Sequence, residues 1–326
     1  MSIGKKLGLG ALALGVSVAG VFGWAKSAGA ARLDHRWDTH RVEIPVPFPL
    51  SAEELRTLEP EGTMLAAEEK DKLALERAVA RGKHLVESRY GCADCHGKDF
   101  GGGTMVDAAP MGKLLGKNLT RGKGSAVANY KTSDWERLVR HGVKPDGTGT
   151  AMPAVDFFEM SDRELSDLIA YIGSLPPVDA AVPNPTFGPL GTILLATGKI
   201  LVPAEMVTDH HAAHAREAPV EAADFGKHLA QTCVGCHGPG FSGGPIPGGD
   251  PAWPVALNLT PHAEGLAGWT YETFEAAVRK GVRKDGTPLR PPMSMITSYA
   301  QKMEDHELRA LWAYLQRVPA KPSGQR

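Results

Sequence analysis

The sequence predicts a mainly helical protein built from two tandem domains. Three observations support this fold class: a motif of two cysteines and one histidine occurs twice, several shorter segments recur at similar distances, and apolar residues between them follow helical spacing. The aromatic content is only 6%, and the chain has 38 glycines and 25 prolines, which favours helices joined by long irregular loops over a large sheet. With 326 residues, the chain is long enough for two domains of ordinary size.

Both copies of the motif have the form C-x-x-C-H. Cys92–His96 reads CADCH, and Cys233–His237 reads CVGCH. This spacing is the attachment signature of a c-type haem, because two thiols three positions apart can form thioethers to the two vinyl groups of one porphyrin. The adjacent histidine then reaches the iron from the same side. A thioredoxin-like cysteine pair or half of a zinc site would leave the repeated histidine unexplained.

The motifs predict two covalently bound haem c groups. All four cysteines of the chain belong to the motifs, and none is left over. The predicted attachment residues are Cys92, Cys95, Cys233 and Cys236, and the predicted proximal iron ligands are His96 and His237.

The segments around the motifs repeat as well. Gly82–Leu85 recurs as Gly226–Leu229, and Asn118–Thr120 recurs as Asn258–Thr260. The distance between matching positions stays between 139 residues (140 to 279) and 144 residues (82 to 226). Two copies of one domain with small insertions explain this pattern, whereas a solenoid would need more repeats.

The repeat and the composition predict how the chain is organised. The last helix of the first copy is expected to start at Ser161, where Glu164 completes a capping box. An earlier helix is predicted with Ser133 as its N-cap and Gly142 as its end. The predicted parts are a signal anchor or signal peptide (1–31), a Pro-rich tether (32–70), a first domain (71–180), a linker (181–218) and a second domain (219–320).

The first residues have the features of a targeting segment. Lys5 and Lys6 precede Leu7–Ala25, an uncharged stretch of 19 residues. That length favours an uncleaved membrane anchor, while Ala28–Ala30 offers an A-x-A site for cleavage of a signal peptide. The lysines place the N-terminus in the cytoplasm by the positive-inside rule. Either alternative exports the body of the protein to the periplasmic side of a bacterial inner membrane, anchored there or free in the periplasm, in agreement with haem attachment across the membrane.

The tether contains Ile44–Pro49, in which three prolines alternate with apolar residues and prevent a helix. Two alternatives follow from this stretch. It is either an extended spacer that holds the haem domains off the membrane, or a loop packed on the first domain.

A haem bound by histidine alone keeps an open face, and a methionine would close that face for electron transfer. In the first copy, Met152 lies in the loop before the last helix. In the second copy, counting from Gly286 favours Met293, and counting back from Met303 favours Met295. We predict Met152 and Met293 as iron ligands, with Met295 as the alternative.

Several other polar residues are expected to have structural roles. His84 and His228 recur beside lysines and are predicted to lie on helix surfaces without binding iron. His141 aligns with Lys280, so this position does not require histidine. Asp209–His214 contains histidines at metal-like i, i+4 spacing, but is expected to be a solvated part of the linker.

Two further groups of residues are expected near the haems. Trp135, Arg140 and Arg279 could pack against or pair with haem propionates; the alternatives are a core position for the tryptophan and solvated surface positions for the arginines. Tyr171 and Tyr314 are expected to pack the last helix of each copy against the helix that precedes its haem motif.

Taken together, these motifs resemble the class I cytochrome c domain over 71–180 and 219–320, and the chain resembles a membrane-anchored bacterial di-haem c-type cytochrome. The shared order is a helix, C-x-x-C-H, Asn-Leu-Thr, a helix ending in Gly-Val, a methionine loop and a last helix. Asn258–Pro261 and the region of Trp269 are also similar to cytochrome subunits of alcohol and sugar dehydrogenases, which usually carry three haems. The resemblance implies a three-helix cytochrome c fold, histidine and methionine ligation, and electron transfer.

The predicted function is a di-haem electron carrier, and not an enzyme, that transfers electrons between periplasmic or membrane redox partners such as a dehydrogenase or a respiratory complex. A net charge of -1 and a pI near 6.9 give no sign of a nucleic-acid partner. One alternative is a di-haem enzyme, peroxidase-like or thiosulfate-oxidising, which would need an iron able to open a coordination position. Another is a structural subunit whose haems only stabilise the fold.

Overall fold

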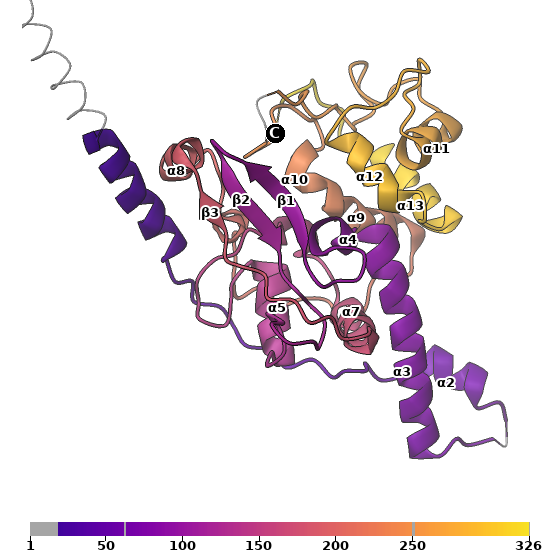
Figure 1. The fold of residues 1–326 in the computed structure, drawn as a ribbon. Helices are drawn as coiled ribbons and strands as arrows, with labels where there is room; N and C mark the ends of the chain where they lie inside the picture. The colour runs from indigo at the N-terminus through magenta and orange to yellow at the C-terminus, as the bar shows by residue number, and fades with distance from the viewer. Residues whose placement is uncertain (1–18, 62, 250–251, 326) are drawn as a thin grey trace, which may run out of the picture.

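Two helical halves of the chain lie next to each other in the computed structural model, which describes residues 19–61, 63–249 and 252–325 (Figure 1). The first half contains α3 (Ala67–His84), the π-helix η1 (Leu85–Arg89), α4 (Cys92–His96), β1 (Gly103–Ala108), β2 (Gly112–Gly116), α5 (Thr132–His141), α6 (Ala154–Phe157) and α7 (Asp162–Ser174). The second half contains α9 (Ala222–Ala230), η3 (Gln231–Cys233), α10 (Val234–His237), α11 (Tyr271–Lys280), α12 (Met293–Ala300) and α13 (Asp305–Leu315). The remaining elements are α2 (Ala52–Leu58), β3 (Thr186–Phe187), α8 (Pro189–Ala196) and η2 (Pro203–Met206).

In each half, the last helix packs across the helix that precedes the haem motif. Gly82 on α3 and Gly226 on α9 allow the closest approach, because a Cβ atom there would lie 2.0 Å and 2.1 Å from a carbonyl oxygen of α7 and α13, respectively. Tyr171 and Tyr314 flank these crossings. The expected packing of the two tyrosines is therefore confirmed, and the repeated glycine has a steric reason.

The helix ends follow the sequence signals with one exception. Ser161 caps α7, and Glu164 completes the predicted capping box. Gly142 ends α5 with a φ of 67°, as expected for a glycine after a helix. The N-cap prediction for Ser133 was wrong, because α5 begins at Thr132 and the Ser133 hydroxyl donates to Glu43 Oε1 at 2.8 Å.

A small antiparallel sheet covers one side of the first half and was not expected from the sequence. Its strand order is β1-β2-β3, and β3 comes from the predicted linker (Figure 1). Gly103 pairs with Gly116, and Gly112 pairs with both Ala108 and Phe187. In the described part of the second half, the matching loop forms only the isolated bridge between Gly244 and Ala256.

The segment predicted as a tether lies against the first domain. Ile44 and Phe48 are only 4% exposed and belong to the first hydrophobic core. Ser166 on α7 donates from its hydroxyl to the Pro45 carbonyl at 2.7 Å. Of the two alternatives for this stretch, a loop packed on the domain describes 44–48 in the structure, because its apolar side chains find a core to enter.

The predicted linker also packs on the first domain. Leu195, Val202 and Ala204 form a separate apolar cluster with Val143, against which Trp37 packs. Residues 19–33 form a helix at the start of the described chain (Figure 1). Its end is held to this cluster by Arg32, whose Nε donates to Glu205 Oε1 at 3.0 Å.

The predicted membrane anchor, Leu7–Ala25, lies mostly outside the described residues. Only its last part, 19–25, is described, as the beginning of the first helix. Among the described helices, none combines the length and the apolar character needed to cross a bilayer.

The two halves meet through two histidine–glutamate pairs. In each pair the histidine belongs to one domain and the glutamate to the other. His84 Nε2 lies 2.9 Å from Glu307 Oε2, and His228 Nε2 lies 2.9 Å from Glu164 Oε2. The two histidines hold matching positions of the repeat, and so do the two glutamates. Both histidines lie on helix surfaces, as expected, and the surface that carries each of them faces the other domain.

Arg89 lies between the two glutamates and contacts both. It donates from Nη1 to Glu164 Oε1 at 2.9 Å, and its Nε contacts Glu307. Each glutamate also caps its own helix, since Glu164 accepts from the Ser161 N–H and Glu307 from the Glu304 N–H. The two buried carboxylates are thus fully engaged, which is the condition under which buried charges are tolerated.

The pKa of Glu307 shows the strength of this interface. Burial alone would raise it, but the hydrogen bond with His84 and the charge of Arg89 outweigh burial and lower the pKa from 4.5 to about 2. The ionised carboxylate therefore stabilises the folded state. This stabilisation is fully present above the unfolded pKa of 4.5 and is lost as the pH falls through about 2. A difference of this size corresponds to on the order of 3 kcal/mol.

We expect Glu307→Gln to remove most of this acid dependence. When the pH falls from about 5 to about 2.5, the free energy of unfolding of the wild type should decrease more than that of the variant, by on the order of 2 kcal/mol. Urea denaturation followed at the haem Soret band measures this difference. Glu68→Gln on the exposed start of α3 is the control, and equal acid dependence in all three proteins would contradict the prediction.

Candidate haem sites

Both motifs lie on short helical turns that bring their cysteines and histidine together. The first forms α4, which begins after Gly91; this glycine has a φ of 56°, and a Cβ atom there would lie 2.4 Å from the Tyr299 ring. The second is shaped by η3, which ends at Cys233, and by α10, which ends at His237. The helical turns bring both cysteines and the histidine of each motif close together, as attachment to a single porphyrin requires.

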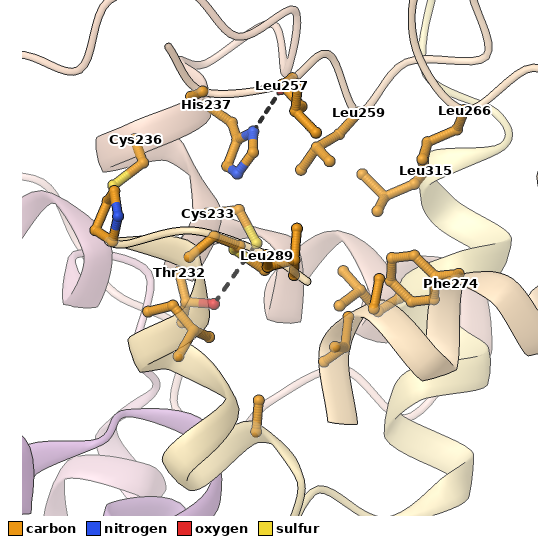
Figure 2. A pocket seen from close by; sticks show the side chains of 18 of the residues that line it. Thr232, Cys233, Cys236, His237, Leu257, Leu259, Leu266, Phe274, Leu289 and Leu315 are labelled. Carbon is orange, nitrogen blue, oxygen red and sulfur yellow. Dashed lines mark hydrogen bonds between the residues drawn. The ribbon is translucent and has the colours of Figure 1, made fainter. Parts of the chain in front are cut away.

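The two motif histidines are held in the same way. His96 donates from Nδ1 to the carbonyl of Lys117 at 2.7 Å, and His237 donates from Nδ1 to the carbonyl of Leu257 at 2.7 Å. A ring fixed through one nitrogen has a set orientation, and iron-binding histidines are commonly held by such a bond. In the second domain the other ring nitrogen, Nε2, points toward a cavity (Figure 2).

The Asn-Leu-Thr repeat explains why these carbonyls are in place, because each carbonyl belongs to the residue just before it. Asn118 Oδ1 accepts from the Thr120 N–H at 2.9 Å and hydroxyl at 2.8 Å. Asn258 Oδ1 accepts from the same two groups of Thr260 at 2.8 Å and 2.7 Å. Each asparagine also donates to the chain beyond the last helix of its domain. The repeat thus positions the histidine ring, a role that spacing alone did not reveal.

The surroundings of the motifs are apolar. Burial raises the pKa of the thiols of Cys92 and Cys233 to about 12. Burial also lowers the pKa of His96, which favours the neutral imidazole that binds iron. Cys92 packs against the first core, and Cys233 packs against the second. The first thiol of each motif therefore faces the interior of its domain.

A cavity of about 640 Å³ opens beside the second motif. Its volume lies within the range of about 300–1,000 Å³ that is usual for cofactor pockets. The side chains around it are mostly apolar (Figure 2). They include Cys233, Cys236, His237, Leu259, Phe274 and Leu315. A flat apolar group bound to both cysteines, with its metal at the histidine, fits this combination of thiols, imidazole and apolar lining.

The predicted methionines occupy different environments. Met293, the first residue of α12, lines the cavity, whereas Met295 is 54% exposed and is not one of the cavity residues. Met152 is half-buried and packs against the same core as Cys92. Two methionines that were not predicted as ligands, Met160 and Met303, also line the cavity beside the second motif.

Each domain touches the haem motif of the other. Asp156 on α6 of the first domain accepts from the Gly235 N–H in the second motif at 2.9 Å. In return, Ser298 on α12 of the second domain donates its hydroxyl to Asp94 in the first motif at 3.0 Å. The helix next to each predicted methionine therefore borders the opposite motif, and the two sites lie on either side of one interface.

The protein contacts of the three residues named as candidates for propionate contact are visible in the structure. Trp135 is 6% exposed and belongs to the first core. Arg140 is only 1% exposed and donates to Asp162 Oδ1 at 3.0 Å, so the solvated alternative is wrong for it. Arg279 is half-buried and donates to Glu275, Asp305 and two backbone carbonyls. Arg140 thus connects α5 to the start of α7, and Arg279 connects α11 to the start of α13.

Two family models match the chain, one in each half. The cbb3-type cytochrome c oxidase subunit III model matches residues 77–172, and the cytochrome c model matches residues 223–319.

Three curated relatives cover most of this chain. The fructose dehydrogenase cytochrome subunit of Gluconobacter japonicus is 28% identical over 271 residues, which is 76% of this chain and 54% of the relative. The gluconate 2-dehydrogenase cytochrome c subunit of Pantoea cypripedii is 27% identical over 296 residues, which is 81% of this chain and 65% of the relative. The diheme cytochrome c-type of Cereibacter sphaeroides is 24% identical over 259 residues, which is 71% of this chain and 82% of the relative. The chain thus spans between half and two thirds of the length of the first two.

The fold, the two motifs and these matches define the class: the protein is a c-type cytochrome with two cytochrome c-type domains. More particularly, it belongs to the di-haem c-type cytochromes and carries two covalently bound haem c groups.

Asp156 gives this pair of sites a pH-dependent charge. Burial raises its pKa to about 7, although the hydrogen bond from Gly235 acts in the opposite direction. Asp156 lines the cavity beside the second motif. When the carboxyl group ionises, its negative charge favours the oxidised iron of the second haem, which carries one more positive charge than the reduced iron.

We expect the reduction potential of the second haem to fall as the pH rises through about 7, with a slope below the limit of about 59 mV per pH unit for one electron. Asp156→Asn should flatten this dependence, whereas Asp224→Asn on the exposed surface of α9 should not. Optical redox titrations between about pH 5.5 and about pH 8.5 test this. A slope that survives in Asp156→Asn would contradict the assignment.

Proposed function

We propose that this cytochrome accepts electrons one at a time from a dehydrogenase and passes them to a further redox protein, without transforming a substrate itself. The haem supplies the redox chemistry, since its iron takes up and releases a single electron. The observation that carries the proposal is the position of the two sites. Helix α6 of the first domain contacts the haem motif of the second domain, and α12 of the second domain contacts the haem motif of the first. Two sites so placed can exchange electrons within one chain.

The proposed site residues are those indicated by the motifs. His96 and His237 would bind the irons through Nε2, because the Nδ1 atoms are held by backbone carbonyls. Met293 is proposed over Met295, because Met293 lines the cavity while Met295 is largely exposed. The full proposed set is Cys92, Cys95, His96 and Met152 for the first haem, and Cys233, Cys236, His237 and Met293 for the second.

The protein contributes orientation and the exclusion of water. The carbonyls of Lys117 and Leu257 fix both imidazole rings. The apolar lining of the cavity beside the second motif would keep water away from a bound iron, and Met152 and Met293, if they bind the irons, would leave no position for peroxide or oxygen. Both effects raise the reduction potential and favour electron transfer over a peroxidase-like or thiosulfate-oxidising reaction.

The donor is proposed from the relatives. Cytochrome subunits named for fructose dehydrogenase, gluconate 2-dehydrogenase and quinone-type alcohol dehydrogenase all match this chain. We therefore propose a dehydrogenase that oxidises a sugar, a sugar acid or an alcohol as the electron source. The protein would work on the periplasmic side of a bacterial inner membrane, with Leu7–Ala25 as its anchor or export signal.

We expect Met293→Leu to change one haem and Met295→Leu to change none. The ferric wild type should show the weak near-infrared methionine-to-iron band for two haems, and Met293→Leu should reduce its intensity to about half. The reduction potential of that haem should fall as well, because a thioether raises it. An unchanged band in Met293→Leu with a halved band in Met295→Leu would reverse the assignment.

The proposed donor is tested in membranes of the source organism, compared with a strain that lacks this protein. Alcohols, sugars and sugar acids are added in turn, and reduction of the cytochrome is followed at its α-band. We expect at least one class of substrate to reduce it and oxygen uptake with that substrate to fall in the deletion strain. Failure of all three classes would overturn the proposed donor, and catalytic consumption of peroxide by the purified protein would favour the enzyme alternative.

A further inference from the structure

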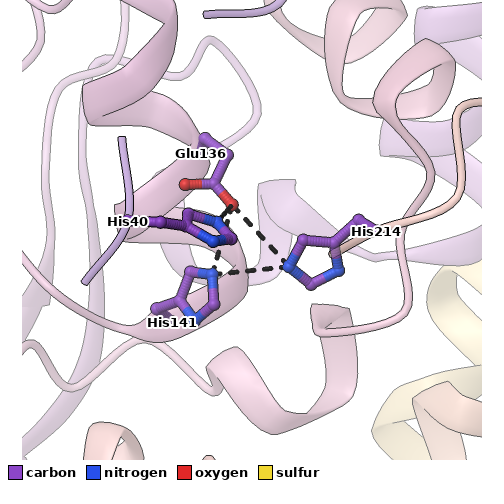
Figure 3. Close-up of side chains that lie close together, drawn as sticks. All are labelled: His40, Glu136, His141 and His214. Carbon is purple, nitrogen blue, oxygen red and sulfur yellow. Dashed lines mark hydrogen bonds and ion pairs between the residues drawn. The ribbon is translucent and has the colours of Figure 1, made fainter. Parts of the chain in front are cut away.

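Four side chains of metal-binding types, none of which belongs to a haem motif, come together from three separate segments in the first domain (Figure 3). His40 comes from the segment before α2, Glu136 and His141 come from α5, and His214 comes from the predicted linker. One ligand atom from each lies within 4.8 Å of all the others. The expectation that the linker histidines are solvated was wrong for His214, whose side chain is only 5% exposed.

The distances between these atoms match a tetrahedral metal site. Glu136 Oε1 lies 3.1 Å, 3.2 Å and 3.7 Å from Nε2 of His40, His141 and His214, respectively, and the Nε2 atoms of His141 and His214 are 3.4 Å apart. Ligand atoms placed tetrahedrally about 2.0–2.1 Å from a zinc ion are separated by about 3.3 Å. These four of the six edges scatter around that value, and the remaining two, from His40 to the other histidines, are bounded at 4.8 Å.

Hydrogen bonds alone do not satisfy this cluster. Three imidazole nitrogens converge on a single carboxylate oxygen, while the other oxygen of Glu136 is buried without a hydrogen-bond partner in the described structure. His141 Nδ1 is likewise buried without a partner there. Glu136 and His141 are fully buried, so water does not compensate them. A cation at the centre would accept one lone pair each from Glu136 Oε1 and the three Nε2 atoms, in place of the contacts that converge on that oxygen.

The neighbouring charges allow a cation at this place. Arg140 Nη1 lies 3.6 Å from Glu136 Oε1 and opposes a metal, but Arg140 is neutralised by Asp162 at 3.0 Å. His210 packs near His141 but is directed to the carbonyl of Ala204 at 3.1 Å. His40 keeps 18% of its side chain exposed, which leaves an entry from solvent.

We propose that His40, Glu136, His141 and His214 form a zinc site. Three imidazoles and one carboxylate in a tetrahedral arrangement are a donor set that suits zinc. The described part of the second domain has no equivalent, because Lys280 stands at the position of His141 and the matching Glu275 pairs with Arg279 at 3.0 Å. The site is therefore an addition to the first domain and not a feature of the repeated haem fold.

The ion would connect helix α5 to two outer segments of the first domain, the one that contains His40 and the one that contains His214. His40 leads into the stretch that inserts Ile44 and Phe48 into the core. Beyond His214, the carbonyl of Ala215 accepts from the Asp162 N–H at 2.9 Å at the start of α7. One bound ion thus fixes the outer segments next to the helix that carries the interface residue Glu164.

The test uses the full holoprotein, in which both haems are attached and the motif histidines are engaged. After chelator treatment, zinc chloride is titrated, and bound zinc is measured by elemental analysis. We expect about one zinc per chain, and a zinc K-edge absorption spectrum with nitrogen and oxygen ligands near 2.0 Å and no sulfur. The Tm should rise on zinc addition.

Two variants each remove one ligand: His214→Gln, and His40→Gln at the more exposed side of the site. Each should weaken zinc binding more than about 100-fold, because even residues that only hydrogen-bond to metal ligands change the affinity by about 10–100-fold. His211→Gln, at a more exposed neighbour, is the matched control and should bind as the wild type does. The Soret and far-ultraviolet spectra report whether each variant folds. Absence of zinc binding in the wild type, or equal affinity in the wild type and both ligand variants, would overturn the proposal.

Discussion

A hydrogen bond from a histidine ring nitrogen to a backbone carbonyl is made twice in this chain, and both haem sites depend on it. His96 and His237 are each held at 2.7 Å by the residue that precedes an Asn-Leu-Thr turn. The bond fixes the orientation of each imidazole ring through the protein alone, without a contribution from a metal. Because the asparagine of each turn is also bound to the chain after the last helix, the iron-binding side of each site is fixed by the whole domain.

The second constraint is the contact between the domains. Two glutamates that cap the last helices also bind the histidines of the opposite domain, and Arg89 joins them. Each carboxylate therefore serves a helix end, a histidine and an arginine at once. This arrangement holds α6 and α12 against the opposite motifs, so the positions of the two haem sites relative to each other follow from buried charges.

Local features were predictable from the sequence, and long-range partners were not. The attachment motifs and the Ser161 capping box each depend on residues a few positions apart, where spacing determines geometry, and the duplication is visible because the same residues recur at a nearly constant offset. His84 and Glu307 are 223 residues apart, and no spacing rule connects them. The same reason applies to His214, which lies in the predicted linker and contacts His141 on α5 across 73 residues of sequence.

The choice between Met293 and Met295 shows this limit at a single site. Both lie at acceptable distances along the sequence, and only the fold places one of them at the cavity. An experimental structure of the matured protein with anomalous scattering at the iron edge tests the account most directly. The account predicts two iron atoms, each between a histidine Nε2 and a methionine Sγ: His96 with Met152, and His237 with Met293. An iron with another ligand opposite its histidine, or a motif without iron, would contradict it.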